Sequence, residues 1–80
     1  MHVAVELSLY PLSDQFVPPI LDFIERLKAR PELTVATNSM STQVSGEFEA
    51  VFGALRTEIA TTLSRRERAV FVMKVLGGGD

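Results

Sequence analysis

Three side chains suited to ligand binding alternate near the start of the chain, at Glu6, Ser8 and Tyr10. A carboxylate accepts hydrogen bonds, a hydroxyl donates and accepts them, and a phenol ring offers a flat surface for stacking. A second polar stretch, with Ser41 and Gln43, follows near the middle of the sequence. These residue types indicate binding by hydrogen bonds and stacking.

The side chains that most enzymes and metal sites need are scarce. The sequence has no cysteine and its single histidine is His2, so a zinc site or a multi-histidine site is not expected. His2 has no evident serine or cysteine nucleophile as a partner. Glu47 and Glu49 adjoin a predicted helix start, where negative charge is favourable for structural reasons. We therefore expect a non-catalytic protein with no metal and no cofactor beyond a bound small molecule.

A short basic cluster consists of Arg65, Arg66 and Arg68. These guanidinium groups could bind a phosphate. They could also form a solvated helix end, where cations are stabilised by the helix dipole. We favour the second interpretation.

Alternation and helical spacing define the elements that must position these residues. Period-two alternation predicts strands, and apolar residues at spacings of three and four predict two helices. The predicted order is strand 3–10, helix 17–29, strand 33–38, strand 42–46, helix 48–63 and strand 69–76, followed by a flexible tail at 77–80. Pro18 and Pro19 fit only in the first turn of the first helix.

This order predicts an α+β fold of the ferredoxin-like βαββαβ type, in one domain spanning residues 1–80. Right-handed crossovers and a short hairpin give a four-stranded antiparallel sheet of strand order 4-1-3-2, with both helices on one face. The first and third strands are then neighbours, so Ser8 and Tyr10 lie near residues 40–43. Glu58 falls at a polar position of the second helix.

Strand parity assigns these residues to the two faces of the sheet. The residues expected on the open face are Glu6, Ser8, Tyr10, Ser41, Gln43 and Ser45. Thr42 and Val44 are expected to face the helices, where Thr42 could hold the hairpin together. Met40 could be a flexible filler or a ligand contact.

The last predicted strand is apolar on both faces. Phe71, Met73 and Val75 can face the helices, while the residues between them, Val70, Val72 and Leu76 among others, point the other way. A sheet face that meets water alternates to polar residues, so this pattern indicates a covered second face. A chain of 80 residues also gains from added support. We expect a homo-oligomer, either a dimer or a tetramer.

Charge and segment patterns limit the other partners. The formal net charge is −2, which gives no broad basic surface for nucleic acid or for an anionic membrane. The chain begins with a strand pattern, so neither a signal peptide nor a transmembrane span is expected. We expect neither nucleic-acid nor membrane binding, and a cytoplasmic location.

Two segments together carry a family resemblance. The run Ser8-Leu9-Tyr10-Pro11-Leu12, followed by residues 38–46 (Asn-Ser-Met-Ser-Thr-Gln-Val-Ser-Gly), resembles the YkoF-type thiamine- and hydroxymethylpyrimidine-binding family. The likeness covers nearly the whole chain and implies a ferredoxin-like fold, oligomers, and binding of thiamine or its pyrimidine moiety. Ser13 departs from the family pattern, where a glycine is expected. Some members carry two such domains in tandem, and a homodimer would supply the equivalent pairing.

An aminopyrimidine ligand needs an acceptor for its exocyclic amine, donors for its ring nitrogens and an apolar surface for its ring. Glu6 or a backbone carbonyl could accept, Tyr10 could stack, and the donors could be Ser8, Ser41 and Gln43. With Met40 and Thr42 these residues form the predicted site, and the implied role is a carrier or accessory in thiamine uptake or salvage.

Two alternatives belong to other functional classes. The open sheet face could dock another chain, which would make the protein a structural or regulatory interaction module that binds no metabolite. An acylphosphatase-like enzyme shares the predicted fold, but the chain has no loop rich in glycine and arginine after the first strand.

Overall fold

Alternation at the start of the chain produces β1 (His2–Pro11). The computed structural model describes residues 1–65 and 68–77. The other elements are α1 (Val17–Lys28), β2 (Thr34–Thr37), β3 (Thr42–Glu47), α2 (Phe48–Ser64) and β4 (Ala69–Gly77). The predicted element order is confirmed, and each boundary moves by at most one residue. Gly77, predicted to belong to the tail, is the last residue of β4, and residues 78–80 lie outside the described part of the chain.

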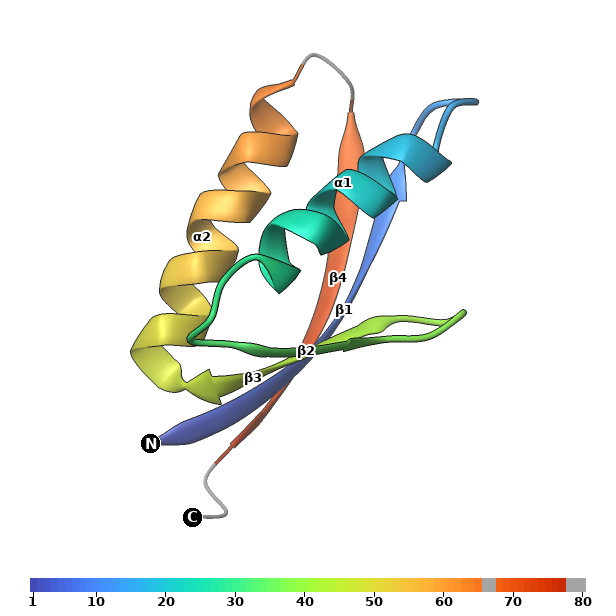
Figure 1. The fold of residues 1–80 in the computed structure, drawn as a ribbon. Helices are drawn as coiled ribbons and strands as arrows, with labels where there is room; N and C mark the ends of the chain where they lie inside the picture. Colours follow the sequence, from blue (N-terminus) through green and yellow to red (C-terminus); the bar gives the residue numbers. More distant parts are fainter. Residues whose placement is uncertain (66–67, 78–80) are drawn as a thin grey trace.

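The strands form one antiparallel sheet in the order β2-β3-β1-β4, which is the predicted order read from the opposite edge. Both helices pack against the same face (Figure 1). The hairpin of β2 and β3 turns away from the line of β1 and β4, so its tip stands apart from the helical layer (Figure 1). The ferredoxin-like arrangement is therefore confirmed.

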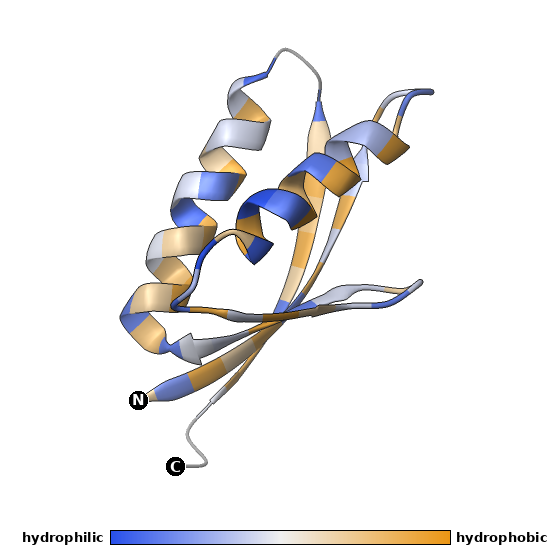
Figure 2. Ribbon diagram, in the orientation of Figure 1, coloured by the Kyte–Doolittle hydropathy of each residue, from blue (hydrophilic) through white to orange (hydrophobic). Residues whose placement is uncertain are grey.

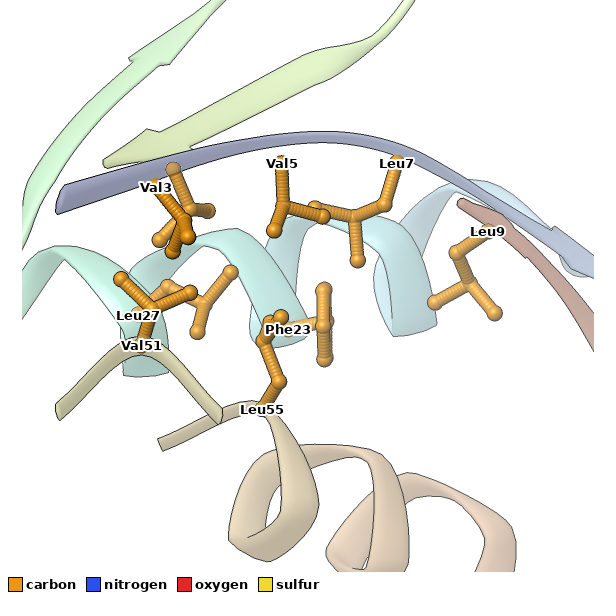
Figure 3. Packing of buried hydrophobic residues seen from close by; sticks show 9 residues of the cluster. Val3, Val5, Leu7, Leu9, Phe23, Leu27, Val51 and Leu55 are labelled. Carbon is orange, nitrogen blue, oxygen red and sulfur yellow. The ribbon is translucent and has the colours of Figure 1, made fainter. Parts of the chain in front are cut away.

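The core lies between this sheet and the two helices. The odd-numbered residues of β1 from 3 to 9 are buried there, together with apolar residues of both helices (Figure 3). The cluster contains Val3, Val5, Leu7 and Leu9 from β1, Val44 from β3, Phe23 and Leu27 from α1, and Val51 and Leu55 from α2. Each fully buried aliphatic side chain contributes about 1.5–3 kcal/mol relative to an exposed one. The predicted facing of β1 and of Val44 is thus confirmed.

A charged contact, here called the interhelical seam, joins α1 to α2 beside this core. Arg26 Nη1 donates to Glu58 Oε1 at 2.6 Å, and Arg30 Nη2 donates to Glu58 Oε2 at 2.8 Å. Glu58 is only 8% exposed. The sequence placed Glu58 at an ordinary polar position, and the structure corrects this, because the two arginines of α1 neutralise a carboxylate that the helices bury.

The predicted facing of β4 holds only in part. Phe71 packs on Phe23, with ring centroids 5.0 Å apart. Met73 and Val75, on the same side of the strand, are 42% and 52% exposed. The reason is that β4 is an edge strand whose outer part is not covered by a helix. Apolar residues run along most of its length (Figure 2), so β4 presents uncovered apolar surface on both faces.

Gly46 ends the second family segment and has a structural reason to be glycine. Its φ angle is +155°, a backbone conformation that side chains with a Cβ rarely adopt. A Cβ at this position would lie 3.2 Å from the carbonyl oxygen of Glu32. Gly46 therefore allows β3 to pass close to the loop before β2 as the chain turns into α2.

Candidate functional site

A chain of polar contacts crosses the open face of the sheet. Gln43 Nε2 donates to Ser41 Oγ at 2.9 Å, and Ser41 Oγ donates to Glu6 Oε2 at 3.2 Å. Glu6 Oε1 lies 3.8 Å from Lys74 Nζ. The register explains this grouping, because Gln43 and Lys74 are the residues directly opposite Glu6 on the two neighbouring strands. The sequence prediction brought Glu6, Ser41 and Gln43 together but missed Lys74, the only charged residue of the last strand.

The end of β1 meets the turn of the β2–β3 hairpin, as the topology predicts. Ser8 Oγ donates to the carbonyl oxygen of Met40 at 3.3 Å. The turn is held by Asn38, whose Oδ1 accepts from the amides of Met40 and Ser41 at 2.7 and 3.0 Å. An Asn side chain that mimics a backbone turn in this way favours one loop conformation. The turn therefore has a fixed shape where it approaches β1.

A cavity of about 400 Å³, here called the turn cavity, lies on the helix side of the sheet beside this junction. It is bounded by the end of β1, the hairpin turn and residues 20–24 of α1 with the loop that precedes this helix. The lining residues are Leu7, Ser8, Leu9, Tyr10 and Pro11, then Phe16, Ile20, Phe23 and Ile24, and residues 37–42 of the hairpin. None of them carries a carboxylate, an imidazole or a cationic group. The turn cavity is thus a neutral pocket with apolar and aromatic walls.

Five of the seven predicted site residues line the turn cavity, namely Ser8, Tyr10, Met40, Ser41 and Thr42. Glu6 and Gln43 do not, because they pair with each other within the β1–β3 ladder and lie on the open face, where both contact Ser41 Oγ. The sequence prediction placed most of the site on that open face, with Thr42 directed toward the helices. The structure shows that the hollow beside these segments opens toward the helices instead.

Residues of α1 and the preceding loop supply walls that the prediction left out. Phe16 is 52% exposed, and Ile20 and Ile24 are partly buried at the edge of the core. Neither Ile20 nor Ile24 is among the predicted site residues, because both fit the apolar spacing that predicts the helix. Their spacing of four residues in the helix is the available signal, but it does not distinguish a pocket wall from ordinary core.

Thr42 faces the helix side, as predicted, and is 6% exposed. Its Oγ1 lies 3.1 Å from Thr37 Oγ1 on the adjacent strand. Thr37 Oγ1 also lies 3.5 Å from the carbonyl oxygen of Ser41. The hydroxyl pair ties β2 to β3 at the base of the turn and adds two polar groups to an otherwise apolar lining.

β1 extends past the end of its pairing with β3. The last pair between them is Leu7 with Thr42, whereas β1 remains paired with β4 as far as Pro11. Residues 8–11 therefore have β4 on one side and the turn cavity on the other. This explains why residues of both parities line the cavity.

The register identifies which backbone groups face that side. The amide of Leu12 donates to Arg68 on the β4 side, and the carbonyl of Met1 accepts from Phe48 on the β3 side. Because backbone groups alternate along an antiparallel strand, the N–H and C=O of odd-numbered residues point toward β3. No residue of β3 pairs with Leu9 in the described register. The Leu9 N–H and C=O therefore have no partner on β3 and form an adjacent hydrogen-bond donor and acceptor at the cavity wall.

Other candidate chemistry lies elsewhere or outside the described residues. Glu47 accepts from the N-terminal amino group at 3.1 Å, and neither it nor His2 lines the turn cavity. Within residues 1–65 and 68–77 no group of three or more His, Cys, Asp or Glu side chains could hold a metal ion. In the same part of the chain, no helix is long and apolar enough to cross a membrane.

Comparison with solved structures gives the same fold over nearly the whole chain. A hypothetical protein from Methanocaldococcus jannaschii is 27% identical, with 99% of this chain and 82% of that chain covered and a TM-score of 0.82. A Thermotoga maritima protein, named provisionally for thiamine biosynthesis or salvage, is 18% identical, with 98% and 85% covered and a TM-score of 0.86. A Streptococcus pneumoniae protein is 18% identical, with 98% and 88% covered and a TM-score of 0.76.

A comparison with curated protein sequences gave no match. The model of the YKOF-related family, by contrast, matches residues 2–75. This range contains both segments on which the resemblance was based and every strand and helix of the fold apart from the last two residues of β4. The chain therefore belongs to the YKOF-related family.

Proposed function

We propose that this protein binds thiamine, through its hydroxymethylpyrimidine moiety, or that moiety alone, in the turn cavity without catalysing a reaction. It then serves as a carrier or accessory in thiamine uptake or salvage in the cytoplasm. The observation that carries the proposal is the neutral cavity where the two family segments meet, with a backbone donor and acceptor at its wall. Family membership and the provisional name of the Thermotoga maritima protein support the choice of ligand.

The turn cavity offers each group that an aminopyrimidine needs. The Leu9 C=O can accept from the exocyclic amine while the Leu9 N–H donates to the adjacent ring nitrogen, as a neighbouring strand would. Apolar walls such as Ile20 and Ile24 suit the flat ring, and the rings of Phe16 and Tyr10 can stack on it. The hydroxyls of Thr37 and Thr42 can bond to the remaining polar atoms.

The charge of the cavity favours the pyrimidine end of thiamine. A cation buried without a counter-ion is strongly disfavoured, and the lining contains no carboxylate. Glu6 lies on the other face of the sheet, 3.8 Å from Lys74 and bonded to Ser41. The positive thiazolium ring of thiamine is thus expected to remain at the mouth of the cavity, in contact with solvent or an aromatic face.

Isothermal titration calorimetry with hydroxymethylpyrimidine and with thiamine tests the proposal. Both compounds should release or absorb heat with a stoichiometry of one per chain. An analogue that lacks only the exocyclic amine should bind at least about tenfold more weakly, because the Leu9 carbonyl loses its donor. Absence of binding by both parent compounds would contradict the proposal. If the analogue binds as tightly as its parent compound, the Leu9 carbonyl does not bind the exocyclic amine.

Self-association forms part of the same proposal, because β4 has exposed apolar residues on both faces. Val70 and Val72 are 45% and 51% exposed on the open face, and Leu76 is 74% exposed. A dimer or tetramer that covers this strand would remove that surface from water. Light scattering at micromolar concentration should give a mass at least twice the monomer's 8.8 kDa.

The same exposed surface favours the alternative of an interaction module that binds no metabolite. The two functions predict different results in one pair of measurements. If the protein self-associates but gives no calorimetric response to either compound, it is an interaction module. A response to either compound supports the carrier, whatever its oligomeric state.

A further inference from the structure

A second cavity, here called the arginine cavity, has a volume of about 550 Å³. It lies between the end of α2, the start of β4 and the first turns of α1. Its polar lining residues are Gln15, Asp22, Thr62, Arg65 and Arg68. Arg66, the third member of the basic cluster seen in the sequence, lies outside the described residues. The structure therefore turns two of the three clustered arginines toward a common hollow.

Positive charge exceeds negative charge among the described residues of this lining. Asp22, its one described acidic residue, accepts from Arg26 Nε at 2.9 Å and from Arg65 Nη1 at 2.7 Å, both through Oδ2. Burial alone would raise the pKa of Asp22, but the hydrogen bonds from Arg26 and Arg65 lower it, so the carboxylate stays ionised near neutral pH. Arg68 is exposed and has no ion pair with any described residue. Among the residues that the structure describes, the cavity thus holds one guanidinium without an ion pair and a second that shares a carboxylate.

Thr62 adds a hydrogen-bond donor from the buried side of the cavity. It is 7% exposed, and its Oγ1 accepts from Arg26 Nη2 at 2.6 Å. A helical threonine hydroxyl commonly donates to the carbonyl four residues earlier, but here the Glu58 carbonyl accepts from Arg26 Nη1 at 3.0 Å. No acceptor for the Thr62 hydroxyl hydrogen is present in the part of the chain that the structure describes. This hydrogen is available to a ligand.

The remaining walls are apolar and give little help to an anion. Pro18 and Pro19 occupy the first turn of α1 and have no amide hydrogens, so that helix start presents few backbone donors. Pro11 and Ala69 complete this side of the cavity. Recognition of an anion here depends on side chains, and the proline walls suit the carbon skeleton of an organic molecule.

We propose that the arginine cavity binds the phosphoryl group of a small organic phosphate through Arg65, Arg68 and the Thr62 hydroxyl. Guanidinium N–H groups match the spacing of phosphate oxygens, and a doubly charged phosphoryl group compensates both arginines. Arg65 exchanges Asp22 for the phosphate, while Asp22 keeps its bond to Arg26.

The position of the arginine cavity allows two sources for the phosphoryl group. Pro11 lines both the turn cavity and the arginine cavity, so the two are adjacent at the end of β1. The phosphoryl group belongs either to a phosphorylated compound whose ring occupies the turn cavity or to a separate organic phosphate. The arginine cavity needs the same chemistry in both cases and does not depend on the function proposed for the turn cavity.

Nuclear magnetic resonance titration with inorganic pyrophosphate tests the site on the intact protein. The side-chain Nε–H signals of Arg65 and Arg68 should shift saturably, with a Kd below about 1 mM. Arg68→Gln should weaken pyrophosphate binding about tenfold, because a charge-assisted hydrogen bond is lost. Arg56→Gln is the matched control, since Arg56 is an exposed arginine of α2 outside the cavity lining, and it should leave the affinity unchanged.

A variant that is expected to bind pyrophosphate more tightly separates loss of the site from general loss of folding, because misfolding can only weaken binding. Asp22→Asn removes the carboxylate that competes for Arg65 and should tighten pyrophosphate binding severalfold. Lack of saturable shifts overturns the proposal. So does an equal loss of affinity in Arg68→Gln and Arg56→Gln, which would indicate general attraction to positive charge.

Calorimetry with hydroxymethylpyrimidine and its phosphate ester distinguishes the two sources. If the ester binds more tightly than the alcohol and Arg68→Gln abolishes that gain, one compound spans both cavities. If pyrophosphate binds but the ester shows no gain, the arginine cavity serves a separate organic phosphate. Both results support the site, and they differ only in where the carbon skeleton lies.

Discussion

Val5 and Val75 are the same residue type and pair directly across β1 and β4. Directly paired residues point to the same face of a sheet. Val5 is nevertheless 0% exposed and Val75 is 52% exposed. The difference arises because β1 is central and covered by both helices, whereas β4 forms an edge. Alternation thus reports the direction of a side chain, and the neighbouring elements decide its burial.

The interhelical seam shows the converse case. Glu58 is charged yet 8% exposed, less than the apolar Val75 of the edge strand. It is tolerated because Arg26 and Arg30 donate to both of its carboxylate oxygens. Burial of a charge requires such pairing, whereas a valine is exposed wherever no neighbouring element packs over it. Residue type alone would rank these two positions in the wrong order.

The largest effect is expected from Val5→Ala, compared with Val75→Ala. Loss of two buried methyl groups and the resulting cavity should cost Val5→Ala about 2–3 kcal/mol of unfolding free energy. Val75→Ala should cost no more than about 0.5 kcal/mol in dilute solution, because the site is already exposed. Urea denaturation of both variants measures the pair. Equal losses would show that β4 is covered even in the monomer.

Glu58→Gln should destabilise the protein by about 2 kcal/mol, because two arginines lose a charged acceptor in a partly buried site. Burial alone would raise the pKa of Glu58, but hydrogen bonds from Arg30 and Arg26 hold it below its usual value of 4.5. A carboxyl group with a lowered folded-state pKa stabilises the fold above its unfolded pKa, and this contribution is lost as pH falls through the folded value.

Stability of the parent should therefore decline below about pH 5, and less steeply in Glu58→Gln. The stabilising contribution of Asp22 is also lost as pH falls, since the pKa of this residue is lowered in the folded state as well. Denaturation midpoints measured between neutral and acid pH provide the comparison. A variant whose midpoint falls as steeply as the parent's would assign the acid sensitivity to other carboxylates.

Ligand-binding measurements distinguish a site in the turn cavity from a site on the open face of the sheet. Tyr10→Ala should weaken hydroxymethylpyrimidine binding by about 1–3 kcal/mol, or roughly five- to 150-fold, through lost ring contact. Glu6→Gln should leave binding of this neutral compound unchanged, because Glu6 faces away from the turn cavity. Leu63→Ala, at a 49% exposed position outside the cavity, is the control for a large side chain lost from the surface. A strong loss of binding in Glu6→Gln would indicate that the ligand binds on the open face of the sheet.

Only a small effect on the folded monomer is expected from Val75→Asp, which places a charge on the uncovered part of β4. Its unfolding free energy in dilute solution should change by no more than about 0.5–1 kcal/mol. The same variant should lower the mass measured by light scattering toward that of the monomer, because a charge cannot be buried at an apolar contact without a partner. An unchanged oligomer would exclude this side of β4 from the interface.

Much of the fold could be predicted from the sequence, because local pattern carried the information. Alternation in β1 and the apolar stripe of α2 are uninterrupted, so each boundary was placed within one residue. Right-handed crossovers then fixed the strand order. The meeting of Ser8 with Met40 followed from that order alone.

The candidate site could be predicted only in part. Parity correctly put Glu6 and Gln43 on the open face, but the hollow lies on the helix side, where α1 and the hairpin diverge. The Leu9 backbone pair depends on where the β1–β3 register stops, and this cannot be read from side-chain types. The contact of Lys74 with Glu6 likewise depends on register, because the β1–β4 pairing places these two residues opposite each other.

The sequence by itself determined which residues alternate, where helices and strands begin, and which two segments meet, because these follow from spacing along one chain. Tertiary structure alone decided that Val75 is exposed, that Glu58 is buried between arginines and that two cavities flank the end of β1. Burial and cavity shape depend on how far one element extends over another. That overlap is set by register and by the packing angles of helices on the sheet, which no local pattern encodes.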